Sequence, residues 1–172
     1  MPTTDRLNLL SKLSFKKGWN YLLLRFSFLY SRFSKKNKHF GFPISISIEP
    51  TTACNLGCPE CPSGLKKFTR PTGNLKYEMN KKIIDELQNH LLYINFYFQG
   101  EPYINPDFLN MVKYASQKKI YCSTSTNAHF LNEENARRTV ESGLDRLIIS
   151  IDGTNQETYS SYRKNGKWNK VI

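Results

Sequence analysis

The sequence lacks three features that would each define a class of protein. It has no uninterrupted apolar run of the roughly 18 residues that a membrane-spanning helix requires. Its four cysteines are too few for a disulfide-stapled scaffold of 172 residues. Acidic residues are also few, 14 against 25 lysines and arginines. With 11 phenylalanines and 10 tyrosines, the chain is still apolar enough to build a core, which argues against disorder.

The positive charge is concentrated at the amino end. Residues 1–40 contain nine lysines and arginines but one acidic residue, Asp5, whereas residues 41–172 contain 16 basic and 13 acidic residues. The basic character therefore belongs to an N-terminal arm, for which we take residues 1–43, and not to the domain expected over residues 44–172. No nucleic-acid partner is expected, because the charge is not a property of that domain.

The arm contains one segment rich in Leu, Phe and Tyr, residues 19–33, with Arg25 near its middle. No small-residue cleavage site is visible, so a signal peptide is not indicated. Two interpretations stay open. The segment is a basic amphipathic helix that lies on an anionic membrane surface, or it packs on the following domain with its lysines in water.

Beyond the arm, the hydrophobic pattern alternates between strands and helices. Short apolar or alternating runs predict strands at residues 44–48, 94–98, 120–126 and 147–151, the last apolar enough to be covered on both faces. Helical spacing and end signals predict helices at residues 79–92, 105–118 with Asn105 as cap, 132–143 with Asn132 as cap and Gly143 as stop, and from the box Thr154–Glu157 onward. Alternating strands and helices predict an α/β fold with a parallel sheet, open or barrel-like.

Three cysteines follow the first predicted strand. Cys54, Cys58 and Cys61 lie within eight residues. Thiolates are soft ligands that suit zinc or an iron–sulfur cluster. A closed zinc site needs a fourth ligand, and the candidates, Cys122, His39, His90 and His129, do not stand at zinc-finger spacing. A [4Fe–4S] cluster held by three cysteines leaves one iron open to a ligand, whereas a ferredoxin-type carrier usually has a fourth cysteine nearby.

The spacing C-x3-C-x2-C after the first strand of a β/α chain resembles the radical S-adenosylmethionine (SAM) superfamily. The resemblance implies that Cys54, Cys58 and Cys61 bind a [4Fe–4S] cluster whose open iron chelates SAM. An electron from the cluster then cleaves SAM to methionine and a 5′-deoxyadenosyl radical, which abstracts a hydrogen atom from a substrate. The cofactors supply this chemistry, and the protein positions them.

The resemblance extends to residues after the second and third predicted strands, at the rim where β/α folds bind ligands. Gly100 and Glu101 resemble the family's Gly-Gly-Glu segment, which meets the amino group of SAM, although Gln99 stands in place of its first glycine. A turn is the alternative interpretation of Gly100-Glu101-Pro102. The family also has polar residues at a strand end, near the methionyl and ribose groups of SAM. The residues that resemble them here are Thr124, Ser125, Thr126 and Asn127.

Residues after the fourth predicted strand resemble the SPASM-type subgroup. Ser150 and Asp152 match its Ser-x-Asp-Gly segment, in which the serine binds SAM, and Arg163 matches an arginine that pairs with the SAM carboxylate. The alternatives are turn chemistry for Asp152 and a solvent-exposed helix position for Arg163. Glu60 stands where the family often has an aromatic or apolar residue near adenine, which is a departure from the pattern.

The resemblance covers about residues 44–170, with four of the six βα units that family members usually close into a partial barrel. We therefore expect a partial (β/α) barrel that is the N-terminal portion of a longer enzyme. The implied partners are SAM, a peptide or small-molecule substrate and a reductant such as flavodoxin or ferredoxin. An oxygen-sensitive cluster implies the cytoplasm, with possible peripheral membrane contact through the arm. The alternative function is a non-catalytic iron–sulfur or zinc-binding electron-transfer module.

Overall fold

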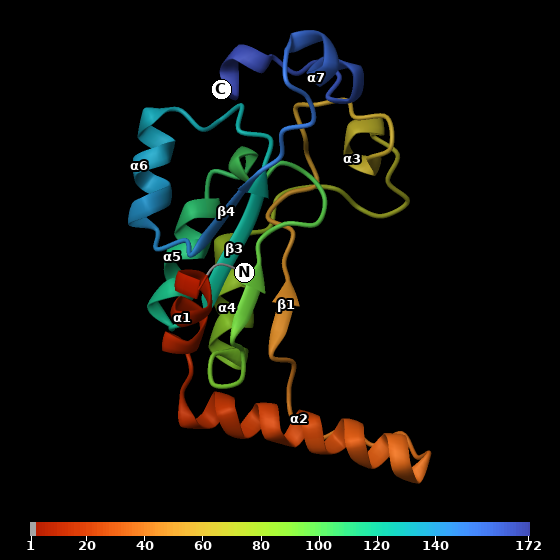
Figure 1. Cartoon of the computed structure of the whole chain (residues 1–172), viewed down its shortest axis with the longest axis vertical. Coiled ribbons are helices and arrows are strands. Elements are labelled where there is room, and N and C mark those ends of the chain that lie inside the picture. The colour runs from red at the N-terminus through yellow and green to blue at the C-terminus, as the bar shows by residue number, and fades with distance from the viewer. Residues whose placement is uncertain (1–2) are drawn as a thin grey trace.

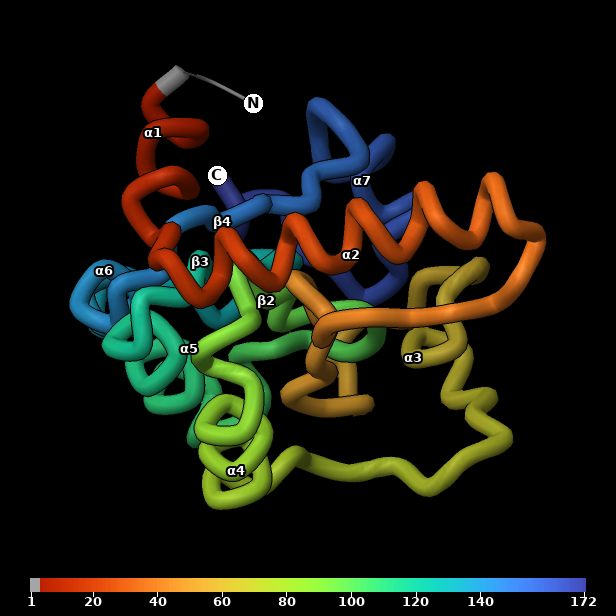
Figure 2. Tube along the Cα trace, turned by 90° about the horizontal axis from the view of Figure 1, so that it is seen from below, coloured from red at the N-terminus to blue at the C-terminus, as the bar shows by residue number. Residues whose placement is uncertain are grey.

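Four parallel strands form one sheet in the computed structural model, which describes residues 3–172. The strands are β1 (Ser45–Ser47), β2 (Tyr93–Asn95), β3 (Tyr121–Thr126) and β4 (Arg146–Ile149), paired in sequence order. The helices over residues 77–87, 108–117 and 133–141 lie on one face of the sheet (Figures 1 and 2), as expected when successive parallel strands are joined by crossovers of one hand. The predicted α/β fold with four βα units is confirmed, and each strand is one or two residues shorter than its predicted run.

Seven helices surround this sheet in the described part of the chain. They are α1 (Thr3–Ser11), α2 (Phe15–Ser34), α3 (Pro62–Leu65), α4 (Tyr77–Leu87), α5 (Phe108–Gln117), α6 (Glu133–Glu141) and α7 (Gln156–Tyr162), with 3-10 turns at Pro102–Ile104 and Trp168–Lys170. The predicted ends of α6 are confirmed, because the Asn132 side chain accepts a hydrogen bond from the Asn135 amide at 2.8 Å and Gly143 has φ +73°. The helix predicted to reach residue 92 ends at Leu87, and the amides of Leu92 and Tyr93 already donate to the Ile44 carbonyl beside β1.

The core lies between the sheet and α4 and α5. Alternate strand residues, including Ile46, Ile94 and Cys122, join a buried cluster with Ile84 of α4 and Met111 of α5. Because strand side chains alternate between faces, the other face carries the intervening residues, which are largely polar. There the Tyr93 hydroxyl donates to Ser123 Oγ, which donates to Asn95 Oδ1, each at 2.8 Å.

Three sequence-based expectations were wrong. Asn105 does not cap α5: it is buried, and its amide nitrogen donates to the carbonyls of Pro50 and Leu75, so it joins loops instead. The capping box of α7 lies one residue later than predicted, at Asn155 and Thr158. β4 is an edge strand and is not covered on both faces: none of its residues is fully buried, and Ile149 is 42% exposed.

The arm packs against the amino-terminal ends of β3 and β4 (Figure 1). Asp145, just before β4, accepts hydrogen bonds from Asn8 Nδ2 at 2.7 Å, from Lys12 Nζ at 2.9 Å and from the Cys122 amide at 2.8 Å. Lys17 of α2 is buried and donates to the Lys119 carbonyl at 2.6 Å, and this burial lowers its pKa to about 8. The expectation that a packed arm would keep all its lysines in water was therefore wrong. Within residues 3–172, no helix is both long enough and apolar enough to cross a membrane.

The arm's attachment gives a stability prediction. Asp145→Ala should lower the free energy of unfolding by about 3 kcal/mol, because it leaves Lys12 and the Cys122 amide without their partner in a nearly buried position. Glu141→Ala is the matched control: its ion pair with Arg137 is mostly exposed and should cost less than about 0.5 kcal/mol. Urea denaturation midpoints measure both, and equal losses would contradict the attachment described here.

Candidate functional site

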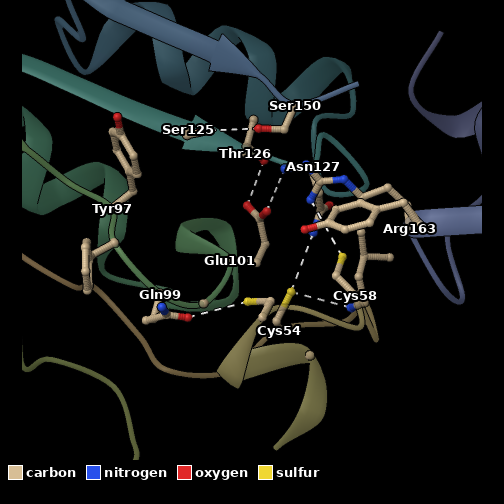
Figure 3. Close-up of a pocket in the computed structure, with 16 residues that line it drawn as sticks. Cys54, Cys58, Tyr97, Gln99, Glu101, Ser125, Thr126, Asn127, Ser150 and Arg163 are labelled. Carbon is tan, nitrogen blue, oxygen red and sulfur yellow. Dashed lines mark hydrogen bonds between the residues drawn. The ribbon is translucent and has the colours of Figure 1, made fainter. Parts of the chain in front are cut away.

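The loops after all four strands meet at one cavity of about 200 Å³ at the carboxyl end of the sheet. The loop after β1 contributes Cys54, Cys58 and Cys61, and the loop after β2 contributes Tyr97 through Glu101. The end of β3, the residue after β4 and the end of α7 add Ser125, Thr126, Asn127, Ser150, Tyr162 and Arg163. Figure 3 shows these side chains converging from separate elements, as expected where parallel strands end together.

The three cysteines of the first loop are free thiols that face this cavity. Each sulfur has a polar neighbour: Cys54 Sγ accepts from the Leu56 amide at 3.5 Å, Cys58 Sγ lies 3.8 Å from Arg163 Nη1, and Cys61 Sγ lies 3.5 Å from Gln99 Oε1. Burial raises the pKa of Cys54. A positively charged metal group would offset that cost, because thiolates are the metal-binding form of cysteine.

Glu101 is the buried carboxylate of the site. Its Oε1 accepts from Thr126 Oγ1 at 2.7 Å and its Oε2 from the Asn127 amide at 2.8 Å. Burial nevertheless raises its pKa, and no lysine or arginine of the described residues forms an ion pair with it. A buried carboxylate with no ion-pair partner is costly, so the cavity suits a ligand that brings an ammonium group.

Gly100 holds the loop of Glu101 against the loop after β1. It has φ +79°, and a Cβ added there would stand 2.2 Å from the Thr51 carbonyl oxygen. Its amide donates to Ser63 Oγ at 2.8 Å, and Gln99 Oε1 lies 3.2 Å from the same hydroxyl. The glycine is therefore required by the approach of one loop to another, and Gln99 lies beside the cysteine loop.

Asn127 and Ser150 line the cavity from β3 and from the end of β4. The Asn127 side chain donates to Asn55 Oδ1 at 2.8 Å and lies 3.9 Å from Cys54 Sγ. Ser150 Oγ is 3.0 Å from Ser125 Oγ. Of the four polar residues predicted at the end of β3, Thr124 does not line the cavity, because its hydroxyl donates to the Phe96 carbonyl within the sheet.

Arg163 enters the cavity from the end of α7, so it is not a solvent-exposed helix residue. Its Nε and Nη2 both lie 2.5 Å from Asp152 Oδ2. Asp152 itself does not line the cavity and aligns the guanidinium from outside. Arg163 Nη1 is directed at the cysteine loop, so the guanidinium offers a positive charge to a carboxylate ligand in the cavity.

The donor set fits a cluster better than a single ion. Within residues 3–172, no three His, Cys, Asp or Glu side chains converge as one metal ion would require. The three sulfurs can lie further apart around a [4Fe–4S] cluster, because each cysteine binds a different iron. The candidates for a fourth zinc ligand lie outside the cavity lining: Cys122 is in the core, His39 is exposed, His90 stacks on Phe42, and His129 accepts from the Lys167 amide.

Aromatic residues of the site were missed from the sequence. Tyr97 and Phe98 follow β2, Tyr162 ends α7, and all three line the cavity. The sequence did contain a signal for them: Tyr97 and Phe98 directly follow a predicted strand, and Tyr162 directly precedes Arg163. Glu60, by contrast, is exposed and lies outside the lining.

Comparisons with known proteins agree with this geometry. The Radical SAM superfamily matches residues 48–172. Mycofactocin maturase MftC of Mycobacterium ulcerans (strain Agy99) is 36% identical over 131 residues, which are 76% of this chain and 35% of that protein. AdoMet-dependent heme synthase of Methanosarcina barkeri (strain Fusaro / DSM 804) is 32% identical over 121 residues, 70% of this chain and 34% of that protein. The chain thus spans about a third of the length of these curated relatives.

Solved structures show the same fold. Streptococcus suis SuiB bound to S-adenosylmethionine matches with a TM-score of 0.59 at 22% identity, over 77% of this chain and 30% of that one. A second SuiB structure, bound to the precursor peptide SuiA, matches with a TM-score of 0.58 at 18% identity, over 82% of this chain and 31% of that one. The family uses a [4Fe–4S] cluster and SAM. The chain belongs to the radical SAM superfamily.

Proposed function

We propose that Cys54, Cys58 and Cys61 hold a [4Fe–4S] cluster and that the adjoining cavity binds SAM, as part of a radical SAM enzyme of the SPASM type. The observation that best supports this is that three free thiols and a buried carboxylate with no ion-pair partner among the described residues meet in one cavity. When bound, the reduced cluster and SAM supply a 5′-deoxyadenosyl radical that removes a hydrogen atom from the substrate.

The role of the chain's own residues in this proposal is to bind and orient SAM. The Glu101 carboxylate receives the methionine ammonium, and the Arg163 guanidinium, aligned by Asp152, receives the carboxylate. Asn127 Nδ2 donates toward the sulfur of Cys54 and stabilises the thiolate. Ser150 offers a hydroxyl to the ligand, and the cavity-lining Tyr97 and Tyr162 give adenine an aromatic surface in place of a residue at position 60.

The substrate class we propose is a peptide. This rests on the names of similar proteins, among them a maturase and SuiB, which has been solved with a precursor peptide. The domain boundary after residue 43, a cytoplasmic location and a flavodoxin- or ferredoxin-type reductant belong to the same proposal. The alternative is a non-catalytic metal-binding or electron-transfer module. It predicts that adding SAM leaves the EPR spectrum of the reduced cluster unchanged.

The cluster assignment is tested with Cys58→Ala. After anaerobic reconstitution with iron and sulfide, this variant should lose the [4Fe–4S] EPR signal of the reduced protein, because one of three ligands is gone. Cys122→Ala removes a buried core thiol and should keep the signal. A normal cluster in Cys58→Ala would refute the ligand set.

The SAM assignment is tested with Glu101→Gln, which keeps the size of the side chain and removes its charge. The cluster should form as before, while SAM binding weakens by about ten- to a hundredfold, the effect expected for a lost charge-assisted hydrogen bond. SAM titration of the reduced EPR signal measures this. Glu60→Gln, an exposed carboxylate of the cysteine loop, is the control, and equal SAM affinity in all three proteins would refute the role of Glu101.

A further inference from the structure

Helix α2 has its polar side turned toward the protein. Asn20 and Ser27, at helical spacing, are buried, and both hydrogen-bond to the backbone of the segment that returns to β1. Asn20 Nδ2 donates to the Phe42 carbonyl at 2.9 Å and its Oδ1 accepts from the Phe42 amide at 2.8 Å. Ser27 Oγ donates to the Lys38 carbonyl at 2.6 Å. The helix is therefore held by polar contacts, and not by burial of an apolar face.

The apolar side of α2 is turned outward. Large side chains recur at alternating intervals of four and three residues, and together we name them the α2 stripe: Phe15, Trp19, Leu22, Phe26, Leu29 and Phe33. At about 3.6 residues per turn, the stripe lies on the side of the helix opposite Asn20 and Ser27. Its members are between 41% and 87% exposed. Exposed apolar patches of this extent mark interaction sites.

The segment of the chain that contains the stripe carries only positive charge. Residues 6–48 contain no aspartate or glutamate. Exposed basic residues lie along and after the helix, namely Lys16, Arg25, Arg32, Lys35 and Lys36. A partner for this face must therefore be apolar within and anionic at its surface.

We propose that the α2 stripe docks on an anionic membrane surface, with α2 lying in the plane of the interface. Phe and Trp rings insert at the boundary of headgroups and acyl chains, while Arg25 and Arg32 reach anionic headgroups. A second copy of the chain fits less well, because it would bring two basic faces together and because helix–helix seams favour Leu, Ile and Val over aromatic residues.

The position of α2 suits this role. It lies across the amino-terminal ends of the strands and extends beyond the sheet (Figures 1 and 2), whereas the cysteine cavity lies at the opposite, carboxyl-terminal ends. Membrane contact through α2 therefore leaves the cavity open to ligands. The inference does not depend on the proposed cluster chemistry, and Cys58→Ala should bind vesicles as the unaltered protein does.

The test is flotation of the purified full-length protein with lipid vesicles. It should float with vesicles of equal parts phosphatidylcholine and phosphatidylglycerol but not with phosphatidylcholine alone, and binding should weaken with added salt. Trp19→Ser with Phe26→Ser should weaken binding by about tenfold or more. Arg25→Gln and Arg32→Gln should each weaken it about fivefold. Val140→Ser, which removes an equally exposed apolar side chain from α6, should change nothing.

A second measurement identifies any other occupant of the stripe. The emission of Trp19, taken as the difference between the protein and Trp19→Phe, should be that of a solvated indole and should shift to the blue with anionic vesicles. Emission already blue-shifted and shielded from acrylamide without lipid would mean that protein covers the stripe. Light scattering would then show whether a second copy or the same chain does so. Either result, or no flotation, would overturn the proposal.

Discussion

Parallel pairing of the four strands in sequence order is the constraint on which the rest of the structure depends. It brings four carboxyl ends to one edge, so that loops far apart in the chain meet there. The thiols come from the loop after β1 and the buried carboxylate from the loop after β2, and these loops lie side by side because β1 and β2 are adjacent and parallel. Glu101 joins the loop after β2 to the end of β3, because its two carboxylate oxygens accept hydrogen bonds from Thr126 and Asn127.

Close backbone packing shapes the cysteine loop. A Cβ at Gly64 would stand 2.6 Å from the Cys58 amide nitrogen, so α3 folds directly back onto the second cysteine. Gly100 likewise allows the loops after β1 and β2 to pack closely against each other. The three sulfurs are thereby held at one wall of the cavity by main-chain geometry. Their polar neighbours come from four different parts of the chain, namely Leu56, Gln99, Asn127 and Arg163.

The two ends of the sheet serve different purposes. The carboxyl end carries the cavity, and the amino end is held to the arm by a polar network in which Asp145 joins α1 to the edge of the sheet. Because α2 is also attached through polar side chains, its apolar residues are left for another surface. An ordinary amphipathic helix would have buried them against the domain. The proposed membrane docking of α2 rests on this inverted orientation.

The order of residues was enough to predict the alternation of strands and helices, the parallel α/β class and the caps of α6, and its cysteine spacing was enough to indicate the radical SAM superfamily. These are local patterns of a few residues, and local physics suffices to read them. It did not determine which face of α2 is buried, because periodicity gives two faces without saying which one meets the protein. Nor did it show that β4 lies at an edge, that Asn105 joins two loops, or that Tyr97 and Arg163 share a cavity with Cys58. These features became visible in the folded chain, because they depend on pairing and packing between segments that are distant in the sequence.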